Sequence, residues 1–501
     1  MCIRDSPRTL SDDSITTFYE DESGGMWLGT SVGGVSFYHP TWARFPSFTV
    51  TAASAERESN NSILRFHAPA SGIDSTGRAQ TLWISTGAGV NRWDRAAGTF
   101  RFYEIDPTLP DIVAYALYED PQGTLWLGTS MGLYTGVPSA GARLDFALVL
   151  PRTAPQVGMV SAIVPHQNGH DLWLALYKIG LARFDPDTGE TVQIYQPDAA
   201  DPGGLSDDLI DGIFPGRGEN LWIPTSAGLD QFNPATGAFV HHQNVPSDEN
   251  SLSPTRILWV YEDERGIVWS GTNGDGLQRF DPATGIWTHY REKDGLPNNV
   301  VYAVLPEHAS AAGTHVWLST NNGLSRFDPD TETFRNYSYL DGLQSNEFNW
   351  QAAYLAPDGE IFFGGVDGIN AFYPEQVGDD SYAPPVYITG LFLANQPVTM
   401  GGDSALDRSI EVAQSARLSY QDRVVSFEFA ALYYAMPERV QYAYMLEGFD
   451  DEWIAAGNRR FVTYTSLPAR EYVLRVKAAN PDGVWNETGA SLPITVVPPI
   501  W

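Results

Sequence analysis

The chain has 501 residues, of which 61 are acidic and 30 basic, so its formal net charge is −31. A field of that sign repels nucleic-acid phosphates and anionic lipid, and the basic residues are scattered, which argues against a nucleic-acid partner. The single cysteine, Cys2, excludes an internal disulfide framework and a thiolate metal site.

The N-terminus has no recognisable leader sequence. Residues 1–6 lack an apolar core, and the sequence from Pro7 onward begins in the middle of a repeat. The sequence ends at Trp501 in the same abrupt way. No run of about 18 apolar residues occurs, so no membrane-spanning segment is predicted within the chain. We therefore expect the sequence to be a fragment of a longer protein.

A short aromatic motif recurs along residues 20–373. Its eight copies centre on Trp27, Trp83, Trp126, Trp173, Trp222, Trp269, Trp317 and Phe362. Successive centres are separated by 56, 43, 47, 49, 47, 48 and 45 residues, a period typical of a four-stranded propeller blade. No helical periodicity accompanies the motif, which argues against a helical solenoid.

Each repeat is predicted to be a four-stranded meander. Residues 112–118 form a strand that leads through the polar turn 119–123 into the tryptophan strand. The turn at 185–189 closes a tight hairpin, because its Pro fixes φ and its Gly accepts a positive φ. The tryptophan strands are apolar on both faces, as expected when neighbouring blades cover them, so we expect tryptophans that pack rather than bind a ligand.

The repeat, Asp-x-x-Gly-x-Leu-Trp-Ile-Gly-Thr followed by Gly-Leu-x-Arg-Phe-Asp-Pro-x-Thr-Gly-x-Phe, resembles the two-component regulator propeller repeat. Residues 263–284 and 181–189 match it closely, and residues 341–348 are similar to the final blade of that family. The resemblance implies an all-β fold with a β-propeller.

We expect one closed, seven-bladed propeller over residues 43–378. The interval after Trp27 is the longest, so residues 1–42 are interpreted as the remnant of a preceding propeller's last blade. Residues 44–50 would then supply the outer strand of the final blade around Phe362. Such closure joins the two ends of the ring and leaves no exposed edge strand.

A second domain is predicted after a linker at residues 379–385. Within residues 386–498, strand-like runs occur at Val424–Leu432, Val440–Glu447, Phe461–Ser466 and Tyr472–Ala479. Several short strands with polar turns and no helical pattern predict a β-sandwich of immunoglobulin or fibronectin type.

Residues 442–453, Tyr464 and Tyr472 resemble the three-tyrosine (Y-Y-Y) domain, which in its family follows regulator propellers and precedes a membrane helix. The resemblance implies a membrane helix just after Trp501, with residues 499–501 as its truncated start, and receptors of this kind are commonly homodimers. Arg470 stands where the family has a turn glycine. We favour core packing of the tyrosines, with their hydroxyls paired, over direct signalling contacts.

By these resemblances, the chain is the periplasmic or otherwise extracytoplasmic sensing region of a bacterial membrane receptor. Its ligand would be a small carbohydrate breakdown product such as an oligosaccharide, and the sandwich would relay the signal. Two alternatives stay open: a scaffold for protein partners, and a propeller glycosidase or lyase. The acidic pairs at 20–21, 119–120 and 262–263 recur at one repeat position, whereas a catalytic pair is normally unique, so we interpret them as solvated turns and expect no catalysis.

We expect the ligand on the propeller face that carries the loops after the tryptophan strands. Six candidate residues lie in those loops: Tyr177, Lys178, Asn273, Asp275, Asn321 and Asn322. An aromatic ring beside amides and a carboxylate suits a sugar, and a lysine suits one that bears an acid group. The alternative that Tyr177 and Lys178 only cover a neighbouring blade stays open, and Asn298 with Asn299 is the next candidate.

No metal or other cofactor is predicted. His166 and His170 are four residues apart, but they bracket a Gln-Asn-Gly sequence that is typical of a loop, not of a helix that would bring both to one ion.

Overall fold

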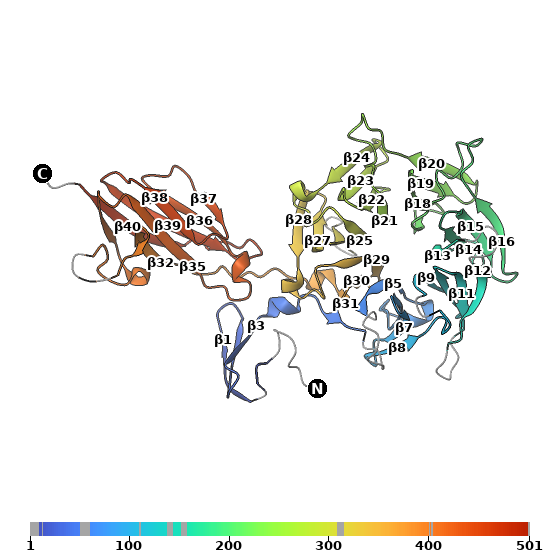
Figure 1. Cartoon of the computed structure of the whole chain (residues 1–501), viewed down its shortest axis with the longest axis horizontal. Coiled ribbons are helices and arrows are strands. Elements are labelled where there is room, and N and C mark those ends of the chain that lie inside the picture. Colours follow the sequence, from blue (N-terminus) through green and yellow to red (C-terminus); the bar gives the residue numbers. More distant parts are fainter. Residues whose placement is uncertain are drawn as a thin grey trace. The chain divides into compact units, whose positions relative to one another are not determined.

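The structure is a computed structural model, and it describes residues 10–12, 14–50, 61–109, 112–137, 144–151, 158–307, 315–399, 401 and 404–498. The chain forms two compact units (Figure 1). One is Arg44–Val377, and the other combines Met1–Ala43 with Gly378–Trp501.

Among the described residues, the unit Arg44–Val377 contains seven four-stranded antiparallel sheets, which Figure 1 shows as the blades of a ring. We name the blades A to G in chain order and give the strands of each from the innermost outward. Blade A has β5 (Ile63–His67), β6 (Thr81–Thr86), β7 (Gly89–Asp94) and β8 (Thr99–Tyr103); blade B has β9 (Ala114–Glu119), β10 (Leu125–Thr129), β11 (Gly132–Gly136) and β12 (Ala147–Pro151). Blade C has β13 (Val160–Pro165), β14 (Leu172–Leu176), β15 (Gly180–Asp185) and β16 (Glu190–Tyr195); blade D has β17 (Phe214–Pro215), β18 (Leu221–Thr225), β19 (Gly228–Asn233) and β20 (Ala238–His242). Blade E has β21 (Ile257–Glu262), β22 (Val268–Thr272), β23 (Leu277–Asp281) and β24 (Ile286–Tyr290); blade F has β25 (Val301–Pro306), β26 (Val316–Thr320), β27 (Gly323–Asp328) and β28 (Thr333–Tyr337). Blade G has β29 (Phe348–Leu355), β30 (Ile361–Gly365), β31 (Gly368–Phe372) and β4 (Ser47–Phe48).

The helical elements among the described residues are single turns of 3-10 helix. They are η1 (Pro40–Ala43), η3 (Ala70–Gly72), η4 (Glu292–Asp294), η5 (Tyr339–Asp341), η6 (Pro374–Gln376), η7 (Ile410–Val412) and η8 (Pro437–Arg439). No helix in the described part of the chain has the length and apolar character to cross a membrane. Residues 499–501, where we expect a membrane segment to begin, lie outside the described residues.

The repeated tryptophans hold neighbouring blades together. Four of these rings each meet an aromatic ring from the third strand of the next blade. The centroid separations are Trp126 to Phe184, 5.8 Å; Trp173 to Phe232, 5.4 Å; Trp269 to Phe327, 5.9 Å; and Trp317 to Phe372, 4.9 Å. Burial of such large rings is a main source of core stability, so the predicted packing role is confirmed.

The ring is closed by a strand from its own N-terminal end. Phe48 pairs with Ile369 and Ser47 with Asn370, so β4 becomes the outer strand of blade G and the predicted seven-bladed closure is confirmed. The strand is shorter than the predicted range 44–50. Phe45, 1% exposed, instead lies against Tyr337 and Phe372, with ring centroids 4.9 and 4.8 Å away.

An ion pair also joins the first and last blades. Arg95, just after β7, donates to both carboxylate oxygens of Glu360, at 2.6 Å each, and both side chains are at most 8% exposed. The bidentate geometry is the strongest arrangement available to an arginine and a carboxylate.

The acidic pairs lie at turns as predicted, but the prediction that they are solvated is wrong for Asp263, which is 3% exposed. Its Oδ1 accepts the backbone N–H groups of Arg265 and Ile267, both at 2.9 Å. Asp120 accepts the N–H of Thr124 at 2.8 Å and the indole N–H of Trp126 at 2.9 Å. These carboxylates recur because they satisfy turn backbone and tryptophan side chains.

The second unit contains a two-layer β-sandwich, in agreement with the predicted fold. One sheet has the order β33 (Gln396–Pro397), β32 (Val386–Leu393), β35 (Val424–Ala431) and β38 (Phe461–Thr465). The other has the order β34 (Ala416–Ser419), β40 (Ala490–Val497), β39 (Glu471–Ala479), β36 (Gln441–Glu447) and β37 (Ile454–Gly457).

The tyrosines of this sandwich are packed in its core, as predicted. Tyr442, Tyr464 and Tyr472 are at most 6% exposed. The Tyr464 hydroxyl donates to Asp450 at 2.7 Å, and that of Tyr472 donates to the carbonyl of Pro468 at 2.8 Å.

The motif copy around Trp27 forms a separate sheet of β1 (Ile15–Glu20), β2 (Met26–Thr30) and β3 (Val35–Tyr38). Its residues contact the sandwich within the same unit. The Trp27 ring lies edge-on to Tyr434 at 5.0 Å, and the indole of Trp42 donates to the carbonyl of Ala435 at 3.2 Å. The sequence analysis does not predict these contacts, and the origin of this sheet in a preceding propeller stays a prediction.

Candidate ligand-binding site

The innermost strand of blade G is irregular. The register of β29 against β30 shifts between Phe348 and Ala353, and Gln351 has a left-handed φ of 56°. Residues 349–352 therefore leave the ladder, and a left-handed non-glycine residue is a conformation that surrounding contacts must stabilise.

Gln351 makes hydrogen bonds across the propeller axis. Its Nε2 donates to the backbone carbonyls of Asp211 at 3.1 Å and Leu258 at 3.2 Å, which belong to blades D and E. Two blades separate D from G on one side of the ring and three on the other, so these bonds span the centre of the propeller. The indole of Trp350 also donates to Leu258, at 3.0 Å.

Arg65, on β5 of blade A, completes the connection. Its Nη1 donates to the carbonyls of Leu64 at 2.6 Å and Trp350 at 2.8 Å, and its Nη2 donates to Oε1 of Gln351 at 2.8 Å. Burial lowers the pKa of Arg65 to about 9, and the side chain of Tyr115 lies near enough to oppose that shift. The guanidinium therefore stays charged at neutral pH.

A second arginine also lies over the Trp350 indole. Arg256 is paired through Nε and Nη2 with Asp211, and this hydrogen bonding raises the pKa of Arg256. The Arg256 side chain is 44% exposed, whereas that of Asp211 is 6% exposed. The guanidinium carbon of Arg256 is 4.6 Å from the Trp350 centroid and that of Arg65 is 5.7 Å away, within the range of cation–π attraction. We call Arg65, Asp211, Arg256, Trp350 and Gln351 the axial cluster.

A cavity adjoins the axial cluster through Arg256. It has a volume of 480 Å³, and it is lined by residues of blade D and of the segment that enters blade E: Thr225, Ser226, Ala227, Gly228, Gln243, Asn244, Ser253, Pro254, Thr255 and Arg256. Six of these ten residues carry a hydroxyl or amide side chain, which suits a ligand with several hydrogen-bonding groups. Asp275 and Arg291 line a second cavity of 680 Å³ that shares Asn244, Ser253 and Pro254 with the first.

Tyr177 and Lys178 follow β14 in a loop one residue longer than the corresponding loop of blade D. Lys178 is exposed and adopts a φ of 64°, and its Nζ lies 5.9 Å from the Tyr177 centroid. Tyr177 is half-buried and near enough to Arg256 to contribute to that residue's raised pKa. Of the predicted residues, Tyr177 therefore lies beside the axial cluster.

The other predicted residues are not brought together in one site. Asn273 is exposed, and its backbone N–H donates to the carbonyl of Arg256 at 2.9 Å. Asp275 is paired with Arg291 at 2.6 Å.

In blade F, Asn321 accepts a hydrogen bond from the hydroxyl of Tyr302 at 3.4 Å. Asn322 donates to the carbonyl of Pro297 at 3.2 Å. In the next candidate loop, Asn299 accepts the backbone N–H of Glu292 at 2.9 Å, and Asn298 accepts that of Val300 at 2.8 Å. Asn298 and Asn299 therefore stabilise their own loop, and Asn322 connects the loop after β26 to the loop before β25.

The sequence analysis did not identify the axial cluster. A signal was available in residues 349–351, where Asn-Trp-Gln interrupts an innermost strand that is otherwise apolar. Bulky polar residues in such a strand indicate a departure from the blade ladder.

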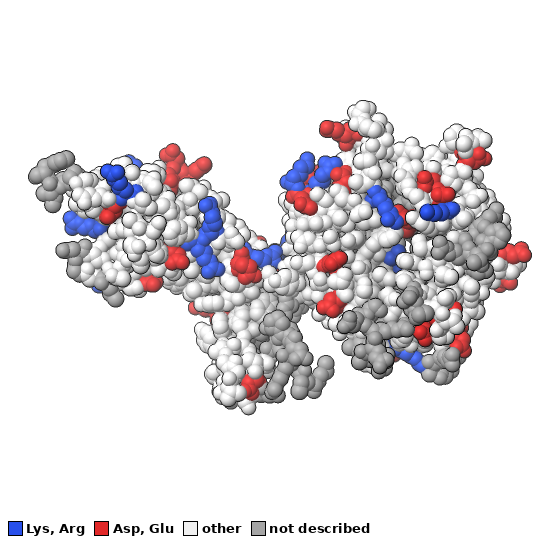
Figure 2. Space-filling view, in the orientation of Figure 1, with Lys and Arg blue, Asp and Glu red and all other residues white. Residues whose placement is uncertain are grey.

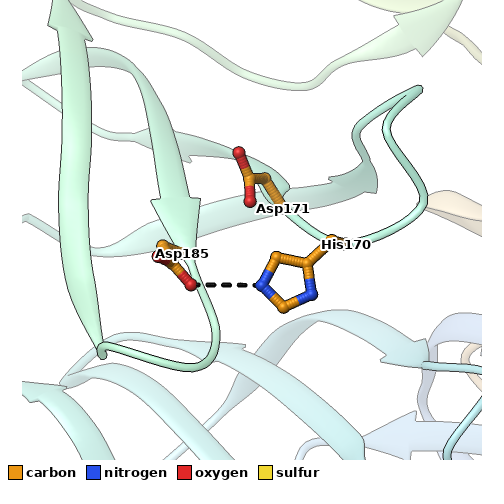
Figure 3. A group of neighbouring side chains, drawn as sticks. All are labelled: His170, Asp171 and Asp185. Atoms are coloured by element: carbon orange, nitrogen blue, oxygen red, sulfur yellow. Dashed lines mark hydrogen bonds and ion pairs between the residues drawn. The ribbon is translucent and has the colours of Figure 1, made fainter.

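One group of potential metal ligands lies on blade C: His170, Asp171 and Asp185 (Figure 3). His170 Nε2 lies 3.2 Å from Asp185 Oδ1, and Asp171 accepts a hydrogen bond from Arg183 Nε at 2.5 Å. Because Arg183 already bonds to the carboxylate of Asp171, a cation is opposed there, and these contacts are explained as polar contacts within blade C.

Charges are mixed on the molecular surface. Figure 2 shows acidic side chains interspersed with Lys and Arg on the face in view. This distribution agrees with the scattered basic residues of the sequence.

Two family models match parts of the chain. Residues 433–497 match the Y_Y_Y domain, and residues 9–31 and 108–131 match the two component regulator propeller. Among curated proteins, Histidine kinase P4 of Formosa agariphila is 25% identical over 344 residues, which are 67% of this chain and 24% of that protein. The chain thus spans about a quarter of the length of this relative.

Solved structures share the fold. The extracellular domain of BT3049 from B. thetaiotaomicron, assigned to a hybrid two component system, is 22% identical with a TM-score of 0.75, covering 98% of this chain and 62% of that one. The extracellular domain of BT4673 from the same organism, assigned to a one component system, is 21% identical with a TM-score of 0.51, covering 98% and 64%. The chain therefore contains two segments that match the two component regulator propeller, followed by a segment that matches the Y_Y_Y domain.

Proposed function

We propose that this chain is the extracytoplasmic sensing region of a membrane-anchored two component receptor, and that its propeller binds a small oligosaccharide released by carbohydrate breakdown. The observation that carries the proposal is the axial cluster beside a cavity of 480 Å³ lined by hydroxyl and amide groups. An aromatic ring packs on the apolar face of a sugar, and hydroxyl and amide groups bond to its periphery.

The relatives support a sensing role over the alternatives. The curated relative carries the name of a histidine kinase, and the solved relatives are extracellular domains of signalling systems. A propeller is a rigid scaffold on which loops hold a ligand without disturbing the core.

The binding test is titration calorimetry of the purified chain against a panel of neutral and acidic oligosaccharides. Once a binding saccharide is found, Tyr177→Ala and Lys178→Ala are compared with Tyr387→Ala, at an exposed position on β32 of the sandwich. We expect a loss of affinity of about tenfold for Tyr177→Ala, since one stacking contact contributes about 1–2 kcal/mol. A panel without any binding saccharide would contradict the proposal, and unchanged affinity in both test variants would place the ligand elsewhere on the propeller.

We propose further that the sandwich relays the signal and that two copies of the receptor act together. Deleting residues 386–498 from the complete receptor should then leave ligand binding intact and remove signalling. Loss of binding in that deletion would instead indicate that the sandwich forms part of the ligand site.

A further inference from the structure

The charge of the axial cluster is unbalanced. In the described part of the chain, Arg65 makes three side-chain hydrogen bonds, and all three acceptors are neutral: two backbone carbonyls and the amide of Gln351. These bonds use neither Nε nor the second hydrogen of Nη2. The neighbouring Arg256, by contrast, is neutralised by Asp211.

Two other arginines of the propeller are also neutralised by a carboxylate. Arg95 is paired with Glu360 at 2.6 Å, and Arg326 with Glu307 at 2.8 Å. Carboxylates are abundant, because the chain has 61 acidic residues against 30 basic ones. A guanidinium that is largely buried and bonds only to neutral acceptors is costly, and such a cost is typical of a functional site.

We propose, building on the sugar-sensing function above, that the ligand is an anionic saccharide whose carboxylate or sulfate group binds Arg65. The planar guanidinium can present two N–H groups to one such group, which no neutral sugar exploits equally. The anion would replace the amide oxygen of Gln351, which now occupies Nη2 at 2.8 Å. The ring of Trp350 links this arginine to the cavity, because Arg256, which lines the cavity, lies over the same ring at 4.6 Å from its centroid.

The experiment compares matched saccharides by titration calorimetry on the complete chain. Each pair consists of an oligosaccharide that contains uronic acid and the same oligosaccharide with its carboxyl groups reduced to alcohols, and sulfated counterparts form a third arm. We expect the acidic or the sulfated member to bind at least about tenfold more tightly than the neutral one. Its affinity should also fall as salt is raised, because the contact is ionic.

Arg65→Met should weaken binding of the acidic member much more than binding of the neutral member, so that the preference for the charged saccharide is lost. Arg279→Met is the matched control, since Arg279 also lies over a tryptophan, 5.8 Å from the centroid of Trp269, but outside the axial cluster. Circular dichroism checks folding. If Arg65→Met does not fold, Arg65→Lys keeps the charge but loses the planar fork, and we expect it to bind the acidic member more weakly than the native chain does.

The inference is overturned if the charged and neutral members bind with equal affinity. It is also overturned if neither salt nor substitution of Arg65 changes the affinity for the charged member. Both outcomes leave the proposed sugar sensing intact. If no saccharide of any arm binds, the proposed function fails, and the inference fails with it.

Discussion

The carboxylate of Glu119, on blade B, accepts a hydrogen bond from the indole N–H of Trp83, on blade A, at 2.5 Å. Glu262 of blade E does the same for Trp222 of blade D, at 2.8 Å. In both cases the glutamate ends an innermost strand and the tryptophan belongs to the preceding blade. The glutamate at the end of an innermost strand and the motif tryptophan of the preceding blade are therefore joined by a hydrogen bond in both pairs of blades.

We expect Glu119→Ala to lower the free energy of unfolding by about 1–3 kcal/mol, because the buried indole N–H of Trp83 loses its acceptor. Glu119→Gln keeps an acceptor and should cost less. Denaturant unfolding followed by tryptophan fluorescence measures both. Glu190→Ala, at an exposed position of β16, is the control and should change stability by less than about 0.5 kcal/mol. Equal stability of Glu119→Ala and this control would contradict the role of the contact.

Closure of the ring depends on Phe45, which is 1% exposed between blades F and G. Phe45→Ala should lower the free energy of unfolding by about 3–5 kcal/mol, because it leaves a cavity among aromatic rings. Val192→Ala, at a position of β16 that is 56% exposed, is the control. Thermal unfolding of both variants checks the prediction, and an unchanged midpoint for Phe45→Ala would show that closure does not need this side chain.

Acid should weaken the contact between blades A and B at His67. Its Nε2 accepts the backbone N–H of Glu119 at 2.9 Å, so the imidazole is neutral, and burial lowers the pKa of His67 to about 4. In the unfolded chain His67 binds its proton near pH 6.5. The contribution of neutral His67 to the free energy of unfolding is therefore complete above that pH and is lost as the pH falls toward 4. The loss amounts to at most about 3 kcal/mol.

His67→Gln should flatten this part of the stability profile. Denaturant unfolding of both proteins at several pH values between 4 and 7.5 measures the difference. Parallel profiles would mean that His67 does not titrate differently in the folded chain.

Alkali should weaken the sandwich through Tyr464. Burial and the hydrogen bond to Asp450, at 2.7 Å, raise the pKa of the Tyr464 hydroxyl far above its ordinary value. The stabilisation is therefore complete below about pH 10 and declines above it, as the unfolded chain loses its proton first. Tyr464→Phe should cost about 1–3 kcal/mol at neutral pH and should show a weaker alkaline decline. Tyr387→Phe, at a position 44% exposed, is the control for calorimetry at both pH values.

We expect no hydrolysis of polysaccharides or glycosides by the chain. The recurring carboxylates accept turn and indole N–H groups, as Asp21 does from Gly25 at 2.9 Å and from Trp27 at 2.7 Å, so they are committed to the fold. Reducing-sugar assays on the purified chain check the expectation, and turnover that disappears with a single carboxylate substitution would overturn it.

The blades and their number followed from the sequence. The motif tryptophan recurs once in each repeat, and so does the third strand that carries an aromatic residue. Their packing depends only on residues of adjacent repeats. The unusual interval after Trp27 was enough to separate β1–β3 from the ring and to assign the closing strand around Ser47. Such features are local or repeat regularly, so a one-dimensional pattern contains them.

The axial cluster depended on the tertiary structure. Arg65 and Trp350 are 285 residues apart, and they meet because closure of the ring places the first blade beside the last. Gln351 reaches blades D and E because β29 departs from its pairing with β30. The repeat pattern does not predict this local shift of register. Seven blades facing one axis bring side chains together from the whole ring, and the distances across that axis are set by the closed fold and not by spacing along the chain.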